Sequence, residues 1–479
     1  LVLAAGWLLR QRVAGPPAAT PPSPTLIVLP LRVVGAEHDE SVLGDGLSEE
    51  LITRLSGVDG LRLISRTSAA LARNANLDLA QLAAKLGVTH ALEGSLQQSD
   101  QQLRIELRLL DVATGRTLWA QSYDRAPNNV LRLESEIAQE VAQALALRFG
   151  LRHTNDATID PRLYQRYLLA RRDAGRGYRA QAIEQLQAIV REAPAFAPAH
   201  ATLARLLVSN LRGTEPDAAE IEEGRREAQQ ALALDPNLAE TQAALAVLSC
   251  RAAQWARCVE LFKHALGLDP SDSDARTSYA YWLSGMGYLD EALSEAETAW
   301  RYDPLNGLDD FVRGRLLDTL GRHDEAWQFL EGLPNPYPQW FNAVWRHDYA
   351  KARELIDRMP EEQHFRESYI AVTAALQDPT LWPQALAAIE DSERRGGRVN
   401  FDRLLMPDPD YAIMIPALEK MLREGWPSYY LLMWMPEQAR LRADPRFSDM
   451  LQRTGIVDYW NSRGWPPQCR RDGARAVCP

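Results

Sequence analysis

The sequence predicts an α/β domain with a mixed sheet, followed by an α-solenoid of helix pairs. Two observations lead to this order. Between residues 25 and 150, two βα steps are followed by a hairpin and a helix, as in an α/β unit with a mixed sheet. Farther along, the dipeptide Asp-Pro recurs every 34 residues, at Asp235-Pro236, Asp269-Pro270 and Asp303-Pro304. Because 479 residues are too many for one compact core, several folded units are expected.

The chain begins with an apolar stretch, residues 1–9 (LVLAAGWLL), which leads into a Pro-rich linker at residues 10–24. Nine residues cannot cross a bilayer, which requires roughly 20. We expect residues 1–9 to be the end of a transmembrane helix whose start lies outside this sequence. A signal-peptide remnant and an ordinary buried segment are the alternatives.

Residues 25–150 show alternating strand and helix patterns. Residues 25–31 form a continuous apolar run, as in a buried strand. A helix is expected to follow it, with Asp45 as N-cap and Leu47, Leu51, Ile52 and Leu55 on one face. The remaining elements expected are a strand at 61–65, a helix at 77–86 that Gly87 ends, hairpin strands at 102–110 and 117–123, and a closing helix at 129–149.

Two polar clusters in this region could carry chemistry. Asp45, Glu49 and Glu50 could bind a metal, but acidic residues at a helix start are more often favoured by the helix dipole. Residues 66–68 (RTS) could bind an anion, whereas the common case is a solvated loop. Gly44-Asp45-Gly46 lacks the spacing of a phosphate-binding loop.

The 34-residue period extends beyond the Asp-Pro dipeptides. Cys258, Ala292 and Ala326 form a second ladder with this spacing, and Gly287 and Gly321 repeat it. This period is that of the tetratricopeptide repeat (TPR), in which each unit is a helix pair. We expect the array to span 158–360, starting with a unit at 161–194, with extra residues near 213–221 and a shortened unit near 349–359. Residues 361–479 are expected to form a helical capping segment and a Cys-containing tail.

In the TPR pattern, the first helix of each unit lines a concave wall. The register places Thr277, Tyr281, Phe311, Arg315 and Asp318 on this wall. We expect them to form a groove for a protein or peptide, because aromatic residues and Arg dominate binding hot spots. The alternative is that Tyr281 and Phe311 only pack neighbouring units.

The four cysteines form two possible pairs. Cys469 and Cys478 flank a polar, basic segment (RRDGARAV), so we expect a disulfide that closes this loop and an oxidising compartment. Cys250 and Cys258 belong to one unit, but their offset looks unfavourable for a disulfide. Their pairing is left open.

No catalytic, cofactor-binding or metal-binding constellation can be read from the sequence. The eight His are isolated, and none lies in an HExxH pattern. The net charge of −11 argues against a nucleic-acid surface within this chain. We therefore expect a chain that is not itself an enzyme and requires no cofactor.

Four segments resemble the TolB N-terminal-like (FlgO-like) domain: DGLSEELI (45–52), ISRTS (64–68), LGVTHALEGSL (86–96) and DVATGRTLWAQSYDR (111–125). In bacterial membrane regulators of the CadC type, such a domain precedes TPR repeats, behind a cytoplasmic winged helix and one transmembrane helix. The tail GIVDYWNSRGWPPQC (455–469) also resembles the end of these periplasmic regions. Some class III adenylate cyclases carry the same domain.

The resemblance implies a non-catalytic sensor and protein-interaction region of a single-pass bacterial inner-membrane regulator, with this region in the periplasm. The expected effector is a CadC-type DNA-binding winged helix missing from this chain. The alternatives are the regulatory half of a class III adenylate cyclase and an anchored periplasmic TPR scaffold. Arg10 and Arg12 oppose export of the residues after them, so the orientation evidence is divided. A homodimer is compatible with the sequence, which does not fix the oligomeric state.

Overall fold

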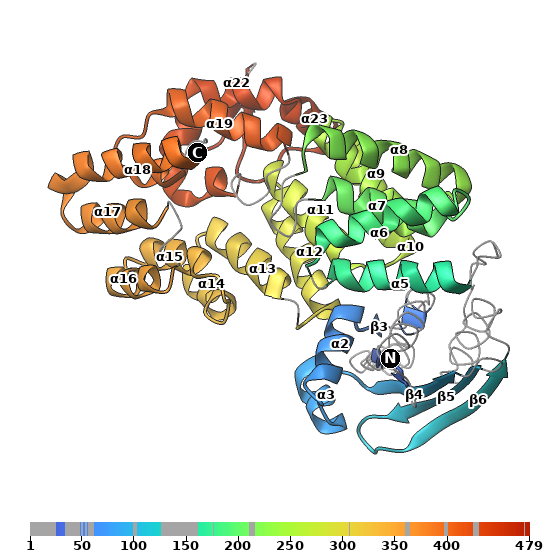
Figure 1. Ribbon diagram of the computed structural model, residues 1–479. Helices are drawn as coiled ribbons and strands as arrows, with labels where there is room; N and C mark the ends of the chain where they lie inside the picture. Colours follow the sequence, from blue (N-terminus) through green and yellow to red (C-terminus); the bar gives the residue numbers. More distant parts are fainter. Residues whose placement is uncertain are drawn as a thin grey trace, which may run out of the picture.

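The computed structural model (Figure 1) shows a small sheet next to a long array of helix pairs. It describes residues 25–33, 48, 51–52, 55, 62–98, 103–125, 161–175, 177–209, 216–305, 307–359, 365–396, 401–424, 431–473 and 475–479. The predictions for residues 1–24, for Asp45, Glu49 and Glu50, and for the helix at 129–149 lie outside the described residues. Within the described part of the chain, no helix combines the length and apolarity that crossing a membrane would need.

The sheet is mixed, as predicted. Its strand order is β3-β1-β4-β5-β6, and β2 pairs with a later part of β4. The pairs that β1 makes with β3 and β4 are parallel, whereas β4–β5 and β5–β6 are antiparallel. The strands are β1 (Thr25–Val28), β2 (Arg32–Val33), β3 (Arg62–Leu63), β4 (His90–Gln98), β5 (Leu103–Asp111) and β6 (Thr117–Arg125).

Three elements of this domain were missed from the sequence, among them the two-residue strand β2. The central strand β4 was not predicted, although it contains part of the motif LGVTHALEGSL. Its Gly94 is required because a Cβ there would clash with the Glu106 carbonyl oxygen on β5. Residues 66–68 are not a loop but the first turn of helix α2 (Arg66–Asn74), whose N-cap is Ser65. The predicted second helix is α3 (Leu79–Leu86), which ends at Gly87 with φ 61°.

Each face of the sheet packs against different helices. Ile27, Leu29 and Ala91 point toward α2 and α3. Leu92, Leu107 and neighbouring strand residues share a core with Leu51, Ile52 and Leu55 and with the start of the helical array. The sheet and the first helix pairs therefore form one continuous hydrophobic core.

The helical array consists of helix pairs, which we number as units 1 to 7. Within each pair the two helices pack against each other, and the first helices of successive units also contact one another. The units are α5 (Pro161–Gly175) with α6 (Arg179–Glu192), α7 (Ala197–Val208) with α8 (Ala218–Leu234), α9 (Ala239–Arg251) with α10 (Trp255–Leu268), α11 (Ser273–Gly285) with α12 (Leu289–Tyr302), α13 (Gly307–Thr319) with α14 (His323–Leu330), α15 (Pro336–Trp345) with α16 (Tyr349–Asp357), and α17 (Arg366–Gln377) with α18 (Trp382–Gly396).

The sequence ladders mark the same positions in successive units. Cys258, Ala292 and Ala326 have no exposed surface, because they lie where the two helices of a unit cross. Asp235, Asp269 and Asp303 are the C-caps of α8, α10 and α12. The Pro that follows each Asp has no N–H to continue the helix.

The turns inside units 1, 3, 4, 5 and 6 use one backbone conformation, with Gly177 at φ 90° in unit 1. Gly287 and Gly321 have φ 87° and 73° there. At the equivalent positions, Ala253 and His347 adopt φ 56° and 57°, although a side chain disfavours this left-handed region. Two non-glycine residues therefore carry a conformational cost that the fold imposes.

The last part of the chain returns to the middle of the array instead of extending it. We call residues 431–479 the return segment. It contains α21 (Ala439–Ala443), α22 (Pro445–Arg453), α23 (Ile456–Arg463), β7 (Arg470–Asp472) and β8 (Arg475–Val477), and it follows α19 (Tyr411–Glu424). In Figure 1, α23 lies beside the green helices of the array, and α23 and α19 contact α10 and α9 of unit 3.

The return segment contacts the turns of three consecutive units. In unit 3, Trp255 Nε1 donates to the Thr454 carbonyl at 2.7 Å. In unit 4, the Met286 carbonyl accepts from Trp460 Nε1 at 2.9 Å. In unit 5, His323 Nε2 lies 3.2 Å from Glu437 Oε1. The segment thus covers the turn edge of units 3 to 5.

Candidate functional site

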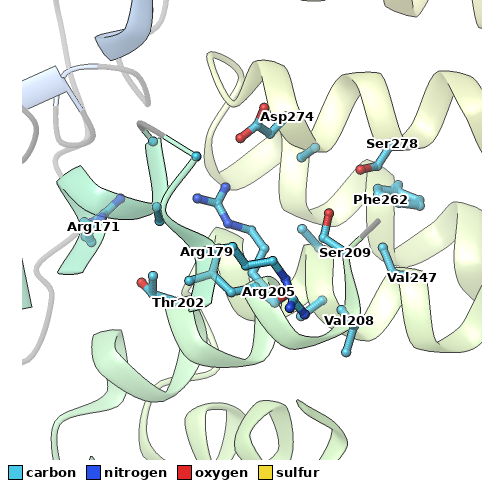
Figure 2. A pocket seen from close by; sticks show the side chains of 17 residues that line it. Arg171, Arg179, Thr202, Arg205, Val208, Ser209, Val247, Phe262, Asp274 and Ser278 are labelled. Carbon is cyan, nitrogen blue, oxygen red and sulfur yellow. The ribbon is translucent and has the colours of Figure 1, made fainter. Parts of the chain in front are cut away.

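A pocket of about 120 Å³ opens on the first helices of units 1 to 4 (Figure 2). Its walls come mainly from α5, α7, α9 and α11, so four consecutive units build it together. The polar residues that line it are Arg171, Arg179, Thr202, Arg205, Ser209, Asp274 and Ser278.

Small side chains create the space between these helices. Ala174 and Gly175 lie at the end of α5, Ala243 and Ala244 on α9, and Ala275 on α11. Phe262 and Val247 supply apolar surface. The pocket is therefore partly apolar and has a few polar groups that can fix the orientation of a ligand, as small binding sites commonly do.

Arg179, the first residue of α6, is held rigidly at the pocket. Its Nε donates to the Leu206 carbonyl at 3.2 Å, and its Nη1 donates to Glu220 Oε1 at 2.8 Å. Its Nη2 is buried, and no described residue provides it with a hydrogen-bond acceptor. A buried charged donor without an acceptor costs free energy, so this nitrogen favours a ligand that supplies one.

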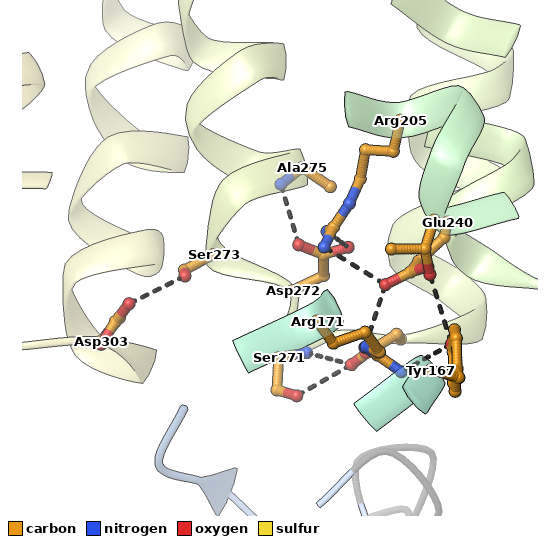
Figure 3. A network of polar contacts seen from close by, with 11 residues as sticks. Tyr167, Arg171, Arg205, Glu240, Ser271, Asp272, Ser273, Ala275 and Asp303 are labelled. Carbon is orange, nitrogen blue, oxygen red and sulfur yellow. Dashed lines mark hydrogen bonds and ion pairs between the residues drawn. The ribbon is translucent and has the colours of Figure 1, made fainter. Parts of the chain in front are cut away.

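The other two arginines share one carboxylate (Figure 3). Glu240, on α9, lies 3.0 Å from Arg171 Nη2 and 3.2 Å from Arg205 Nη2. Thr202 donates its hydroxyl to the other Glu240 oxygen at 2.6 Å. Glu240 thus links the first helices of units 1, 2 and 3.

Arg205 extends this network to unit 4. Its Nη1 lies 3.4 Å from Oδ2 of Asp272, the N-cap of α11. Burial raises the pKa of Asp272 to about 6, although Arg205 acts in the opposite direction. Burial lowers the pKa of Arg205, but Glu240 and Asp272 outweigh it and leave this pKa above its ordinary value. Arg205 is therefore charged at all physiological pH values, whereas Asp272 titrates just below neutrality.

A second polar chain starts beside Asp272 and reaches the α/β domain. Ser273 donates its hydroxyl to Asp303 Oδ2 at 3.2 Å. Asp303 Oδ1 accepts the backbone amide of Ser68 at 3.0 Å and its hydroxyl at 2.8 Å. The sequence indicated that residues 66–68 could bind an anion. The anionic group bound there is the side-chain carboxylate of Asp303, a residue of the helical array. The ion-pair network of Arg205 and the hydrogen bonds to the α/β domain thus start from adjacent residues, Asp272 and Ser273, at the beginning of α11.

The residues predicted to form a groove lie in units 4 and 5, and most of them are buried. Thr277, Tyr281, Arg315 and Asp318 are at most 3% exposed, and Phe311 is half-buried.

Their contacts join neighbouring first helices. Thr277 donates to Asp309 at 2.7 Å, and Asp318 accepts from Asn342 at 2.6 Å. Arg315 lies over the Phe341 ring, 5.5 Å from its centroid. Tyr281 belongs to the hydrophobic core of the array and Phe311 packs against it, as in the alternative interpretation, and binding at this position stays a prediction.

Two turns carry the same tripeptide, Arg-His-Asp, at 322–324 and 346–348. His323 lies between Asp318 at 3.0 Å and Glu437 at 3.2 Å, whereas His347 is exposed and contacts Tyr349. His323 and His347 both line an open depression of about 560 Å³. In the described part of the chain, no three His, Cys, Asp or Glu side chains are arranged to hold a metal ion.

All four cysteines lie in the described part of the chain and are paired. The structure contains the predicted disulfide Cys469–Cys478. It also joins Cys250 to Cys258, although their offset looked unfavourable in the sequence. The Cα atoms are 5.1 Å apart because Cys250 lies in the last turn of α9 and Cys258 in the first turn of α10, across a tight turn at Ala253.

Sequence reasoning missed the pocket arginines, but a signal for them exists. Arg171 and Arg205 are 34 residues apart, so they occupy equivalent positions in units 1 and 2. Arg179 gives no such signal in the sequence. Its hydrogen-bond acceptors, Leu206 and Glu220, belong to unit 2, so no local pattern connects them with Arg179.

Comparisons with known proteins give limited matches. No family model matches the chain. Putative adenylate cyclase 3 of Rhizobium meliloti (strain 1021) is 29% identical over 293 residues, which cover 58% of this chain and 43% of that protein. The chain therefore spans less than half the length of this curated relative.

Among solved structures, TolB from Acinetobacter baumannii is 17% identical over 26% of this chain and 28% of its own, with a TM-score of 0.21. A mutant form of MamA is 19% identical over 40% of this chain and 97% of its own, with a TM-score of 0.25. Naa15/Naa10 bound to HypK-THB is 14% identical over 63% and 52%, with a TM-score of 0.24. TM-scores this low do not establish a shared overall fold.

Proposed function

We propose that this chain is a regulatory region that binds a segment of a partner protein on the first helices of units 1 to 4. The observation that carries the proposal is the pocket that these four helices build, with Arg171, Arg179 and Arg205 on its walls. A site formed jointly by consecutive units is a general property of helical repeat arrays, whose extended inner surfaces bind partners.

The network behind the pocket supports this proposal because it fixes the arginines in advance. Glu240 and Asp272 hold Arg205, and Glu220 holds Arg179. Side chains that are already ordered lose little entropy when a ligand binds, so more of the contact energy contributes to affinity.

A matched pair of variants tests this site. A peptide display library would be selected on the wild-type chain, and the clones would then be measured on Ser278→Trp and Ser294→Trp. Ser278 lines the pocket on α11, and Ser294 is exposed on α12 of the same unit. We expect Ser278→Trp to abolish binding of the clones and Ser294→Trp to preserve it. Clones that bind both variants as well as wild type would refute the proposed site.

We further propose that the effector regulated by this region is a nucleotide cyclase domain. The name of the curated relative supports this alternative, and the part of that protein that this chain does not match is long enough for an effector domain. The winged-helix effector implied by the CadC resemblance is the competing proposal. In both, this chain itself supplies no catalytic residue.

One assay separates the two effectors. The complete gene product would be incubated with ATP and a divalent cation, and cyclic AMP would be measured. Cyclic AMP formation supports the cyclase. Retardation of promoter DNA without cyclic AMP formation supports the winged helix instead. If neither occurs, the anchored scaffold is favoured.

We also propose that this region lies in the periplasm, anchored to the inner membrane. The two disulfides support this, because such bonds persist in oxidising compartments. Intact cells would be treated with a membrane-permeant maleimide before lysis, and the chain would then be analysed by mass spectrometry. We expect no alkylated cysteine. Alkylation of all four would place the region in a reducing compartment.

A further inference from the structure

The pocket has one donor that the protein leaves without an acceptor. Among the described residues that line it, only Arg179 has a buried side-chain nitrogen, Nη2, with no hydrogen-bond partner. The other two nitrogens of its guanidinium are held by the Leu206 carbonyl and Glu220, so the group cannot turn to satisfy Nη2 elsewhere. A ligand oxygen in the pocket would satisfy it.

From this arrangement we infer that the pocket binds a carboxylate of the partner segment, an Asp or Glu side chain or a chain terminus, with Arg179 as its primary donor. The inference rests on the proposed function and deepens it by naming the chemistry that is recognised. Arg–carboxylate hydrogen bonds are about twice as strong as neutral ones, and Nη2 can donate one such bond to a carboxylate oxygen.

The size of the pocket favours one side chain over a larger ligand. Its volume of about 120 Å³ is below the several hundred Å³ typical of sites for drug-sized molecules. Ala174, Gly175 and Ala243 line the pocket with small side chains or none, so the main chain of a bound segment can lie close to the helices.

The charges around the pocket favour a carboxylate over a phosphate. Asp274, on α11, lines the same space and interacts with Arg205. A phosphate group carries almost twice the charge of a carboxylate near neutral pH, so Asp274 repels it more strongly. Arg171 and Arg205 are paired with Glu240, and Arg179 is paired with Glu220 through Nη1, so the Nη2 of Arg179 is the donor that remains for a ligand.

A pair of peptides that differ only in charge tests the inference. The probes are acetyl-hexaglutamate amide and acetyl-hexaglutamine amide, with free glutarate as a third ligand, and binding would be measured by calorimetry at low salt. The chain has a net charge of −11, so nonspecific attraction cannot account for tight binding of the acidic probe. We expect the Glu peptide to bind wild type at least about tenfold more tightly than the Gln peptide.

The variants are Arg179→Gln and Arg191→Gln, which make the same charge change on α6. Arg191 is exposed and lies outside the pocket. Arg179→Gln should weaken binding of the Glu peptide by about tenfold, and Arg191→Gln by less than about twofold. Thermal unfolding of both variants would show that they remain folded.

Three outcomes overturn the inference. Equal affinity of wild type for the Glu and Gln peptides shows that the carboxylate is not recognised. Equal losses in the two Arg variants show an effect of overall charge. Glutarate that binds as tightly as the Glu peptide shows that the ligand is a small acid, not a protein segment. Library clones that are sensitive to Ser278→Trp would leave the proposed function intact in the first two cases.

Discussion

Ser68 and Asp303 are bonded across 235 residues of sequence. The Asp303 carboxylate accepts both the backbone amide and the hydroxyl of Ser68, and the same hydroxyl accepts the Leu305 amide at 2.9 Å. Asp303 is 1% exposed, and it also accepts from Ser273. An acid of the repeat ladder thus joins the first turn of α2 to the junction between units 4 and 5.

Replacing this acid should loosen the α/β domain. In Asp303→Ala, the amide and hydroxyl of Ser68 lose a buried charged acceptor, so we expect a loss of about 1–3 kcal/mol in stability and faster amide exchange in α2. Asp269→Ala is the matched control, because Asp269 is the equivalent C-cap and, among the described residues, its side chain bonds to Ser271 of the same turn. Equal exchange of α2 in both variants would show that Asp303 does not hold the domains together.

The return segment should make one turn glycine more sensitive than another. Gly177 and Gly287 both have positive φ, so a change to Ala costs each about 1 kcal/mol. At Gly177 nothing lies near an added Cβ, whereas at Gly287 it would be 3.2 Å from Trp434 and from Gln468. Urea unfolding should therefore show a larger loss for Gly287→Ala than for Gly177→Ala. Equal losses would mean that the return segment does not press on this turn.

The contact between His323 and the return segment should weaken at alkaline pH. Hydrogen bonds to Asp318 and then to Glu437 raise the pKa of His323 from 6.5 to about 9. A raised pKa means that the folded state binds the proton more tightly, so the stabilisation is complete below pH 6.5 and disappears as the pH rises through 9.

Melting temperatures between about pH 6 and 9.5 would test this contribution. The difference between wild type and His323→Gln should shrink as the pH rises. His347→Gln is the control, because this exposed His occupies the next Arg-His-Asp tripeptide and contacts Tyr349 instead of the return segment. A constant difference between wild type and His323→Gln would exclude the proton as the cause.

Binding of an acidic segment should strengthen below pH 6. Burial raises the pKa of Asp272 to about 6, so its carboxylate loses its charge there while most Glu side chains of a peptide remain ionised. The charged groups that act on Asp272 are Arg205, Asp269 and Asp274. Once Asp272 is neutral, Arg205 contributes more positive charge to the pocket.

The measurement compares the Glu peptide at about pH 5.5 and 7.5. We expect tighter binding at the lower pH in wild type and little change with pH in Asp272→Asn, since Asn caps a helix as well as Asp does. The same pH dependence in Asp272→Asn would assign the effect to another group.

The repeat units could be predicted from the sequence because the constraint that forms them is periodic. Wherever two helices of a unit cross, a small residue is needed, and Cys258, Ala292 and Ala326 reveal the spacing directly. Helix α2 was missed because its first turn, at residues 66–68, is polar, although Ser65 has the side chain of an N-cap. Spacing of small residues and N-cap side chains can therefore be read from the sequence, because they depend on residues of the same helix pair.

The pocket and the return segment depend on contacts that no local pattern encodes. Trp255 and Thr454 are 199 residues apart, and Trp460 and Met286 are 174 apart. The groove was placed at Tyr281 and elsewhere in units 4 and 5 because those units have the clearest period. There the first helices pack closely on each other, whereas the pocket lies among the first helices of units 1 to 4.

The return segment also fixes how many units the middle of the array can contain. An open solenoid can gain or lose a repeat unit with little effect on the rest, because each unit touches only its neighbours. Here the return segment contacts three successive turns through Thr454, Trp460 and Glu437. The spacing of these three residues therefore has to match the spacing of the turns in units 3 to 5. Duplication or deletion of a unit inside this span would move every later turn away from the residue of the return segment that it contacts. We therefore expect that added or lost units would be tolerated in units 1, 2, 6 and 7 but not in units 3 to 5.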